Sequence, residues 1–326
     1  MADRFNTAAT AVGVVGLGLM GSSIVVSLLM AGHAVKAIAP LPEDMEAGPR
    51  RIREQLLYCK AAGLLEGAVE DCLVRLTITD DYGALRGCSL LQECVIEKVE
   101  IKEQVYRKMA AATPENPVIV SNTSAIPIST LQLLVPAPER FLGLHWAEPA
   151  YATRFLEITC GALTTPEHAE WVFALAHQWG KEPTLLRKDI RGFITNRLMY
   201  AVYREVLHLV AKGCATLEDA DKCFRYDAGS WITLMGIFRR MDFTGLEDHA
   251  AVFRNYFPRL SNASGVPPLM QQMVSENARG VHNCNGFYEY TPEEARRWEE
   301  AFSHFNRDIH RLARLYPSNP VTPANV

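Results

Sequence analysis

Short apolar runs alternate with amphipathic segments over roughly the first half of the chain. Apolar residues at three- and four-residue spacing predict helices over Met20–Ala31, Arg50–Leu65 and Glu100–Ala111. The runs predicted to form buried strands are Val12–Val15, Ala34–Ile38, Leu73–Ile78, Leu90–Val95, Val118–Ser121, Phe141–His145 and Phe155–Thr159. Strands that alternate with helices predict an α/β fold, in which helices cover both faces of a doubly wound, mostly parallel sheet.

The pattern changes near Asp189, after which helical stretches follow one another without a comparable strand-like run. These stretches are Phe193–Ala211, Leu217–Tyr226, Gly245–Tyr256, Pro267–Ala278 and Pro292–Leu312. At 326 residues, the chain is long enough for two domains. We therefore expect a sheet-containing domain over residues 1–188 and an all-helical domain over 189–326, which would shape a substrate cleft and supply a subunit interface.

Composition and charge argue against several classes of protein. Hydrophobic residues make up 48% and charged residues 21% of the chain, as in a folded globular protein. The net charge of −4, with Lys and Arg scattered, argues against a nucleic-acid partner. The apolar stretch Ile24–Ala31 is too short to cross a bilayer and residues 1–10 lack a signal-peptide pattern, so we expect a cytoplasmic protein without a membrane partner. The eight cysteines lack metal-ligand spacing, so we expect reduced thiols and no metal.

A glycine-rich turn, Gly16-x-Gly18-x-x-Gly21, lies between the first predicted strand and the helix after it. In a dinucleotide-binding turn the first glycine permits the tight bend, the second leaves room for a pyrophosphate, and the third lets helix and strand pack closely. The helix N-terminus, at Leu19 and Met20, would attract the phosphate charge. An ordinary glycine-rich turn is the alternative, but the flanking patterns favour a Rossmann-type site for a nicotinamide dinucleotide.

The position that normally selects the cofactor in such a unit is unusual. A carboxylate about 20 residues after the glycines usually binds the adenosine ribose of NAD, and here that position is Ala39. No arginine stands beside it to bind the 2′-phosphate of NADP, so we expect NAD without excluding NADP. Asp44 or Glu43 could reach back to the ribose, although both could also be solvated residues at the start of a helix.

Polar residues near the ends of the apolar runs are candidate catalytic groups, because ligands bind at strand ends in an open α/β sheet. Each has a structural explanation, as a helix cap (Ser124, Asn196), a core histidine (His145) or an ion-pair partner (Glu157). The short segment between His145 and Glu157 contains Pro149, and a turn there would bring the carboxylate against the imidazole. Such a pair removes a proton from a substrate hydroxyl, whose oxygen Ser124 and Asn196 would bind.

These motifs resemble those of the 3-hydroxyacyl-CoA dehydrogenase family in order and spacing. The matching residues are the glycine turn with Leu19-Met20-Gly21, Ser121-Asn122-Thr123-Ser124, Gly143-Leu144-His145, Phe155-Leu156-Glu157 and Gly192-Phe193-Ile194-x-Asn196-Arg197, and the similarity runs from Ala11 to about Tyr290. The resemblance implies that His145 is the general base, Glu157 its partner, and Ser124 and Asn196 the ligands of the substrate oxygen. It also implies that Glu97, Lys102 and Ser124 reach the cofactor, and that the helical domain forms a homodimer.

Three departures from the family concern the substrate. The usual Gly-Pro-Phe-Glu stretch is Gly236-Ile237-Phe238-Arg239, an asparagine after the histidine is replaced by Glu148, and the helix Arg51–Ala61 has no clear counterpart of the CoA-binding positions. Other segments look more like the small-acid branch, which includes carnitine, gulonate and pyridine-carboxylate dehydrogenases and lambda-crystallin. We expect an NAD(P)-dependent oxidoreductase of a 3-hydroxy acid or a 3-hydroxyacyl-CoA, the latter with a role in fatty acid metabolism. Because Ala39 and Glu148 replace two residues expected at the cofactor, the alternative is a cofactor-poor, non-catalytic metabolite-binding or structural relative.

Overall fold

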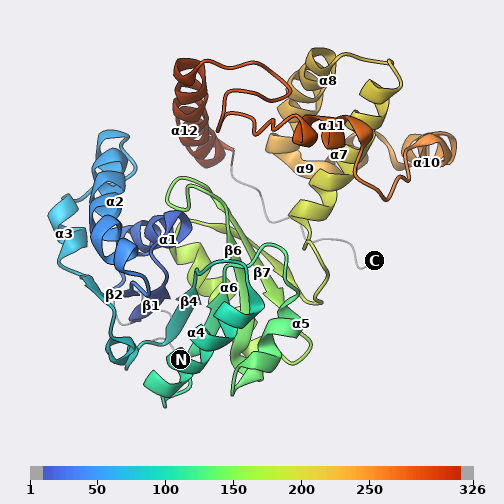
Figure 1. The fold of residues 1–326 in the computed structure, drawn as a ribbon. Coiled ribbons are helices and arrows are strands. Elements are labelled where there is room, and N and C mark those ends of the chain that lie inside the picture. The colour runs from blue at the N-terminus through green and yellow to red at the C-terminus, as the bar shows by residue number, and fades with distance from the viewer. Residues whose placement is uncertain (1–9, 317–326) are drawn as a thin grey trace. The chain divides into compact units, whose positions relative to one another are not determined.

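The computed structural model describes residues 10–316 and divides into two units, with the division between Ile194 and Thr195 (Figure 1). The boundary expected from the sequence lies a few residues earlier, between positions 188 and 189. We describe each unit by itself.

The N-terminal unit is built on one eight-stranded sheet with the strand order β3-β2-β1-β4-β5-β6-β7-β8. Its strands are β1 (Val12–Val15), β2 (Val35–Ile38), β3 (Leu76–Thr79), β4 (Leu90–Glu93), β5 (Val118–Ser121), β6 (Phe141–Trp146), β7 (Phe155–Cys160) and β8 (Glu182–Leu186). Neighbouring strands are parallel except β6 and β7, which are antiparallel. The predicted doubly wound, mostly parallel α/β sheet is confirmed.

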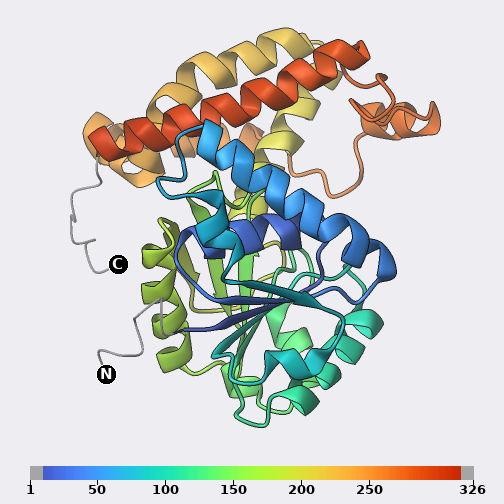
Figure 2. The same ribbon diagram turned by 90° about the vertical axis from the view of Figure 1, so that its left-hand side faces the viewer.

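Helices cover both faces of this sheet (Figure 2). The helices are α1 (Leu19–Met30), α2 (Pro42–Ala61), α3 (Val69–Leu73), α4 (Val99–Ala112), α5 (Ile128–Leu131) and α6 (Pro166–Gln178). One apolar cluster joins α1, α2 and α6 to the sheet through residues such as Ile52 and Val172. A second cluster joins α4 and α5 to the opposite face through Met109 and Leu131. Because both faces are covered, strands β1 and β5 are buried along their whole length, and Ser121 at the end of β5 is their one polar residue.

Three elements of this unit differ from the expectation. Leu73 belongs to helix α3 rather than to a strand, and β3 begins only at Leu76. Helix α2 begins at Pro42, two turns before the predicted start, because Pro42 at its first position and acidic residues in its first turn favour a helix N-terminus there. Strand β8 was not predicted, since Pro183 interrupts its pattern; proline is tolerated there because β8 lies at the edge of the sheet.

The C-terminal unit is helical. Its helices are α7 (Thr195–Ala211), α8 (Leu217–Cys223), α9 (Gly229–Thr244), α10 (Leu246–Tyr256), α11 (Pro268–Ser275) and α12 (Pro292–Leu315). The sequence pattern did not predict α9, in which Gly236 has non-helical dihedral angles (φ 73°, ψ −169°) and interrupts the periodicity. Between Thr195 and Tyr316 the β-pairing is limited to two isolated bridges, so the predicted all-helical character is confirmed.

No helix within residues 10–316 combines the length and apolar character needed to cross a membrane. Among the side chains that the structure describes, no three from His, Cys, Asp or Glu come together as a metal-binding group.

Candidate active site

The predicted site residues of the N-terminal unit meet at one edge of the sheet. Strands β1, β4, β5 and β6 run parallel, so their carboxyl ends lie at the same edge, and the strand order reverses between β1 and β4. Strand β7 runs the opposite way, which brings its first residues to that edge too. Ligands of open α/β sheets bind at such a reversal point, so this edge is the candidate active site.

The glycine turn after β1 has the shape of a phosphate cradle. Gly16 has φ 98°, and a Cβ on Gly21 would stand only 1.8 Å from the Gly16 carbonyl oxygen, so both positions require glycine. A Cβ on Gly18 would meet nothing within 4 Å, which leaves open space beside the turn. Helix α1 then begins at Leu19 with no side-chain cap and no acidic residue in its first turn. These features fit a dinucleotide whose pyrophosphate lies against Gly18 and the N–H groups of Leu19 and Met20.

Ala39 and the two acids that could replace a strand-end carboxylate, Asp44 and Glu43, lie in different surroundings. The side chain of Ala39 is 1% exposed and belongs to the apolar cluster beneath α1 and α2. Asp44, in the first turn of α2, accepts a hydrogen bond from the Leu17 N–H at 3.3 Å. Glu43 is exposed one position before it. Asp44 is therefore the acid that reaches the glycine turn.

Glu97 links the segments that follow β4 and β5. Its Oε1 accepts hydrogen bonds from the Thr123 hydroxyl and from the Ser124 N–H at 3.2 Å, while Lys102 Nζ lies 3.1 Å from Oε2. Partial burial opposes ionisation, but the Thr123 hydroxyl and the Lys102 ammonium outweigh it and hold the pKa of Glu97 below its usual value. Three predicted residues, Glu97, Lys102 and Ser124, are thus connected, and the Ser124 side chain is exposed at the end of β5.

Glu93, the last residue of β4, belongs to this site and was not among the residues predicted from the sequence. Its carboxylate is fully buried and accepts hydrogen bonds from Lys102 at 2.8 Å, the Tyr106 hydroxyl at 2.8 Å and the Ser121 hydroxyl at 2.7 Å. A buried ion pair is tolerated when hydrogen bonds satisfy its remaining atoms. Glu93 therefore fixes the position of Lys102, and its signal in the sequence was a carboxylate inside an apolar run.

His145 and Glu157 lie opposite each other on β6 and β7. His145 Nδ1 is 3.4 Å from Glu157 Oε2, and the other carboxylate oxygen accepts the Ile194 N–H at 2.9 Å. Glu157 is 1% exposed, whereas the His145 side chain is 16% exposed and so reaches the surface of the edge. With Nδ1 directed at the carboxylate, Nε2 is the ring atom available to a substrate.

Two phenylalanines flank the imidazole, and the sequence reasoning did not assign them a role. The rings of Phe155 and Phe193 lie 5.7 Å and 5.9 Å from the His145 ring, centroid to centroid. Gly192 and Phe193 both have positive φ, at 81° and 51°, so the backbone bends sharply before Ile194 donates its N–H to Glu157. A positive φ is unusual for phenylalanine and occurs where surrounding contacts impose it, often at functional sites.

Asn196 belongs to the C-terminal unit, in the first turn of α7. It follows by two positions the Ile194 whose N–H binds Glu157. Its role as a ligand of the substrate oxygen stays a proposal from the family resemblance.

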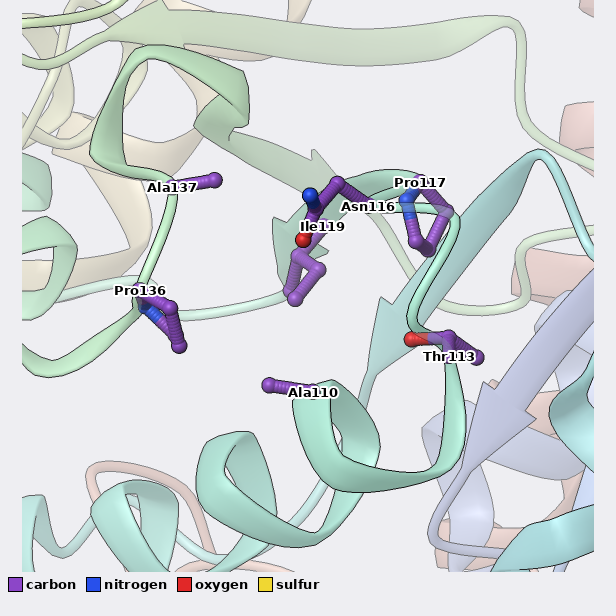
Figure 3. Close-up of a pocket in the computed structure, with 7 residues that line it drawn as sticks. All are labelled: Ala110, Thr113, Asn116, Pro117, Ile119, Pro136 and Ala137. Carbon is purple, nitrogen blue, oxygen red and sulfur yellow. The ribbon is translucent and has the colours of Figure 1, made fainter.

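A small hollow on the N-terminal unit lies at a different place (Figure 3). It is lined by Ala110, Thr113, Asn116, Pro117, Ile119, Pro136 and Ala137. Pro117 directly precedes β5, so the hollow is at the amino end of that strand, whereas the glycine turn follows the carboxyl end of β1. We therefore do not assign it to the candidate active site.

Lys181 supports the loop that connects His145 to Glu157. The Lys181 ammonium is buried, donates hydrogen bonds to the carbonyls of Ala150 and Thr153, and lies 5.4 Å from the centre of the Trp146 ring. Burial lowers the pKa of Lys181 to about 7, with a smaller opposing effect from Cys59. Keeping the buried amine charged therefore costs folding free energy, and this cost is relieved when the amine loses its proton at higher pH.

We expect the stability of the protein to rise between about pH 7 and about pH 8.5, in part through Lys181. Its folded-state pKa lies below the unfolded value of about 10.4, so the unfolded chain binds more protons in this range and loses stability relative to the native state as pH rises. One such group contributes up to about 1.4 kcal/mol per pH unit. Above this window Cys59 acts in the opposite sense, because burial raises its pKa to about 12.

Urea unfolding at both pH values, in the wild type and in Lys181→Met, measures this contribution. The variant leaves two carbonyls without their donor and is expected to be less stable at every pH, but its pH slope should be smaller. Equal slopes in the two proteins would contradict the assignment.

The chain is similar to known proteins over most of its length. Residues 11–190 match the NAD binding domain of 3-hydroxyacyl-CoA dehydrogenase, and residues 192–290 match its C-terminal domain. A 5-formyl-3-hydroxy-2-methylpyridine 4-carboxylate 5-dehydrogenase of Mesorhizobium japonicum is 31% identical over 286 residues, which are 87% of this chain and 92% of the relative. An L-carnitine dehydrogenase of Oceanobacillus iheyensis is 33% identical over 234 residues, or 72% of this chain and 76% of the relative.

Solved structures show the same fold. A crystal structure of 5-formyl-3-hydroxy-2-methylpyridine 4-carboxylic acid 5-dehydrogenase, described as an NAD+ dependent dismutase, aligns with a TM-score of 0.86 at 29% identity and covers 93% of this chain and 98% of that chain. The (S)-3-hydroxybutyryl-CoA dehydrogenase from Ralstonia eutropha aligns with a TM-score of 0.72 at 25% identity, over 86% of this chain and 99% of that chain.

Proposed function

Because this chain belongs to the 3-hydroxyacyl-CoA dehydrogenase family of NAD-dependent dehydrogenases, we propose that it oxidises the hydroxyl group of a small 3-hydroxy acid or its CoA thioester to a carbonyl group, or catalyses the reverse reduction. The observation that supports this most is the contact between His145 Nδ1 and Glu157 Oε2, at the edge of the sheet where the glycine turn also lies. Membership of a family of dehydrogenases is the reason to set aside the non-catalytic alternative.

His145 is the proposed general base. Glu157 holds the proton of the neutral ring on Nδ1, which leaves the Nε2 lone pair to take the proton of the substrate hydroxyl. The carboxylate then stabilises the imidazolium that forms. The rings of Phe155 and Phe193 lie against the imidazole and shield it from water. In the reverse direction the imidazolium returns the proton to the substrate oxygen.

The glycine turn and the segments after β4 and β5 are the proposed cofactor ligands. When bound, NAD would supply the acceptor for the hydride of the substrate. Gly16, Gly18 and Gly21 shape the turn, and Leu19 and Met20 offer N–H groups to the pyrophosphate. Glu97, Lys102 and the Ser124 side chain extend the same edge toward His145, where Ser124 would also donate to the substrate oxygen. Asn196 is given the latter role by family resemblance alone.

The substrate is proposed as a class. The free-acid branch is supported by relatives named as carnitine and pyridine-carboxylate dehydrogenases. The CoA-thioester branch is supported by relatives named as 3-hydroxybutyryl-CoA dehydrogenases. A fluorescence titration with NADH, followed by NAD reduction assays with 3-hydroxybutyryl-CoA, 3-hydroxybutyrate and L-carnitine, would test the proposal. Failure to bind NADH would contradict it, and the substrate preference would choose between the branches.

We also propose that the helical unit is completed by a second copy in a homodimer. Helices α7 to α11 contain no buried residue, and large apolar side chains are exposed on them. On α9 alone, Phe238 is 79% and Phe243 is 78% exposed. Apolar surface of this kind marks an interaction site more often than a free surface.

Replacing Phe238 and Phe243 by glutamine is expected to raise the dimer dissociation constant by about 10²–10⁴-fold, because burying one phenylalanine contributes about 1.5–3 kcal/mol. Sedimentation velocity over a range of concentrations would measure the change. Leu57→Gln, which alters an exposed leucine of the N-terminal unit, serves as the matched control and should leave association unchanged. A monomeric wild type would contradict the proposal.

A further inference from the structure

The carboxylate that an NAD-binding unit usually carries at the end of its second strand is absent from this chain. Ala39 follows β2, its N–H donates to the Thr79 carbonyl, and its side chain is 1% exposed in the same apolar cluster as Leu17 and Ile52. Position 39 therefore offers no acceptor to a ribose hydroxyl.

Helix α2 brings a different carboxylate to the glycine turn. Asp44 Oδ2 accepts the Leu17 N–H at 3.3 Å, and two turns later Arg51 donates to the Leu17 carbonyl at 2.5 Å and to Ser22 Oγ at 3.3 Å. Gly48 lies between Asp44 and Arg51, and a Cβ there would stand 3.1 Å from Leu17 Cβ. Because Gly48 has no side chain, helix α2 approaches Leu17 closely enough for Asp44 to accept its N–H and for Arg51 to donate to its carbonyl.

Asp44 retains a free carboxylate oxygen beside the expected position of the cofactor. Within residues 10–316 the hydrogen bonds of its side chain involve Oδ2, which leaves Oδ1 as a further acceptor. Leu17 directly precedes Gly18, where the open space for the pyrophosphate lies. The adenosine ribose is joined to the pyrophosphate through a single methylene group, so a carboxylate bound to Leu17 is within reach of the ribose hydroxyls.

We propose that Asp44 is the residue that selects NAD over NADP in this chain, taking from helix α2 the role that a strand-end acid has in related units. Its carboxylate accepts hydrogen bonds from the ribose hydroxyls of NAD and repels the 2′-phosphate of NADP. The Arg51 guanidinium donates its hydrogen bonds to the Leu17 carbonyl and to Ser22 Oγ. This inference rests on the dinucleotide site proposed above.

A purely structural role for Asp44, in which it only holds the Leu17 N–H, makes a different prediction. Loss of such a support would weaken NADH and NADPH by the same factor, because both share the pyrophosphate. Loss of a selecting charge would weaken NADH and strengthen NADPH, because Arg51 would then attract the 2′-phosphate. The ratio of the two dissociation constants therefore separates the two roles.

Asp44→Asn is the informative substitution, since its amide oxygen can still accept the Leu17 N–H while the negative charge is lost. We expect the preference for NADH over NADPH to fall by about 10-fold or more, the effect of losing a hydrogen bond to a charged group. Fluorescence titration of the full chain with NADH and with NADPH measures both constants. The control is Glu43→Gln, which removes the same charge from the exposed neighbouring position and should leave the ratio unchanged.

The possible outcomes are distinct. A reduced ratio in Asp44→Asn with an unchanged ratio in Glu43→Gln supports the inference. Equal weakening of both dinucleotides, or the same change of ratio in both variants, overturns it while leaving the proposed function standing. If the wild type bound neither dinucleotide, the proposed function would fail and this inference with it.

Discussion

Replacement of His145 by alanine is expected to lower turnover by about 10²–10⁴-fold, the usual contribution of a general base. The affinity for NADH should not change, because His145 lies at the end of β6 whereas the pyrophosphate is expected at the turn after β1. Steady-state kinetics and an NADH titration on the same preparation would check both parts. A wild-type rate in the variant would eliminate His145 as the base.

Glu157→Gln tests the partner of the base more specifically than a truncation. A glutamine amide can direct an N–H at Nδ1 of His145, and the ring proton must then sit on Nε2, where it blocks removal of the substrate proton. We expect a loss of turnover comparable to that of the histidine variant, again with intact NADH binding. His168→Ala is the matched control for the His145→Ala variant, since His168 lies on α6 and bonds to Thr165 outside this site.

Gly18→Val is expected to weaken NADH binding by at least about 100-fold without unfolding the protein. The branched side chain would occupy the open space beside the turn and exclude the pyrophosphate from the helix N-terminus, and each hydrogen bond to a charged group contributes about 1.5–3 kcal/mol. Gly18 has φ −61° and ψ −166°, an extended conformation that valine adopts without strain. An unchanged NADH affinity would show that the turn holds no dinucleotide.

Gly21→Ala is the contrasting variant for the same turn. Its Cβ would stand 1.8 Å from the Gly16 carbonyl oxygen, so the turn or the helix must move to accommodate it. We expect this variant to lose thermal stability, whereas Gly18→Val should melt near the wild-type temperature. Circular dichroism melts of both proteins would separate a lost binding site from a lost fold.

The features that the sequence predicted best are those whose signal is local. Strands β1 and β5 have the predicted bounds, because strands covered on both faces are apolar at nearly every position and so form short, recognisable runs. The glycine turn is also a local signal, since Gly16 has a positive φ and a Cβ on Gly21 would meet the carbonyl oxygen of Gly16, five residues earlier. Elements with interrupted patterns were missed, as with Pro183 in β8 and Gly236 in α9.

The candidate site shows the same division. The types and order of Ser124, His145 and Glu157 were readable from the chain, and the antiparallel pairing of β6 and β7 places the last two opposite each other. The partners that orient such groups were not readable. Glu93 stands out in the sequence only as a carboxylate inside an apolar run, which does not indicate its partners, and its bonds to Lys102 and Ser121 exist only because β4, α4 and β5 pack together.

The sequence by itself thus determined the α/β class, the helical second domain, the phosphate turn and the identity of the catalytic candidates. Only the tertiary structure decided that Ala39 lies in the core and that Asp44 bonds to Leu17 from helix α2. The physical reason is that periodicity reports which side of an element is buried, whereas a contact between distant residues depends on how closely two elements approach. Here Gly48 permits that approach, and nothing in the local pattern around Asp44 indicates which residue it faces.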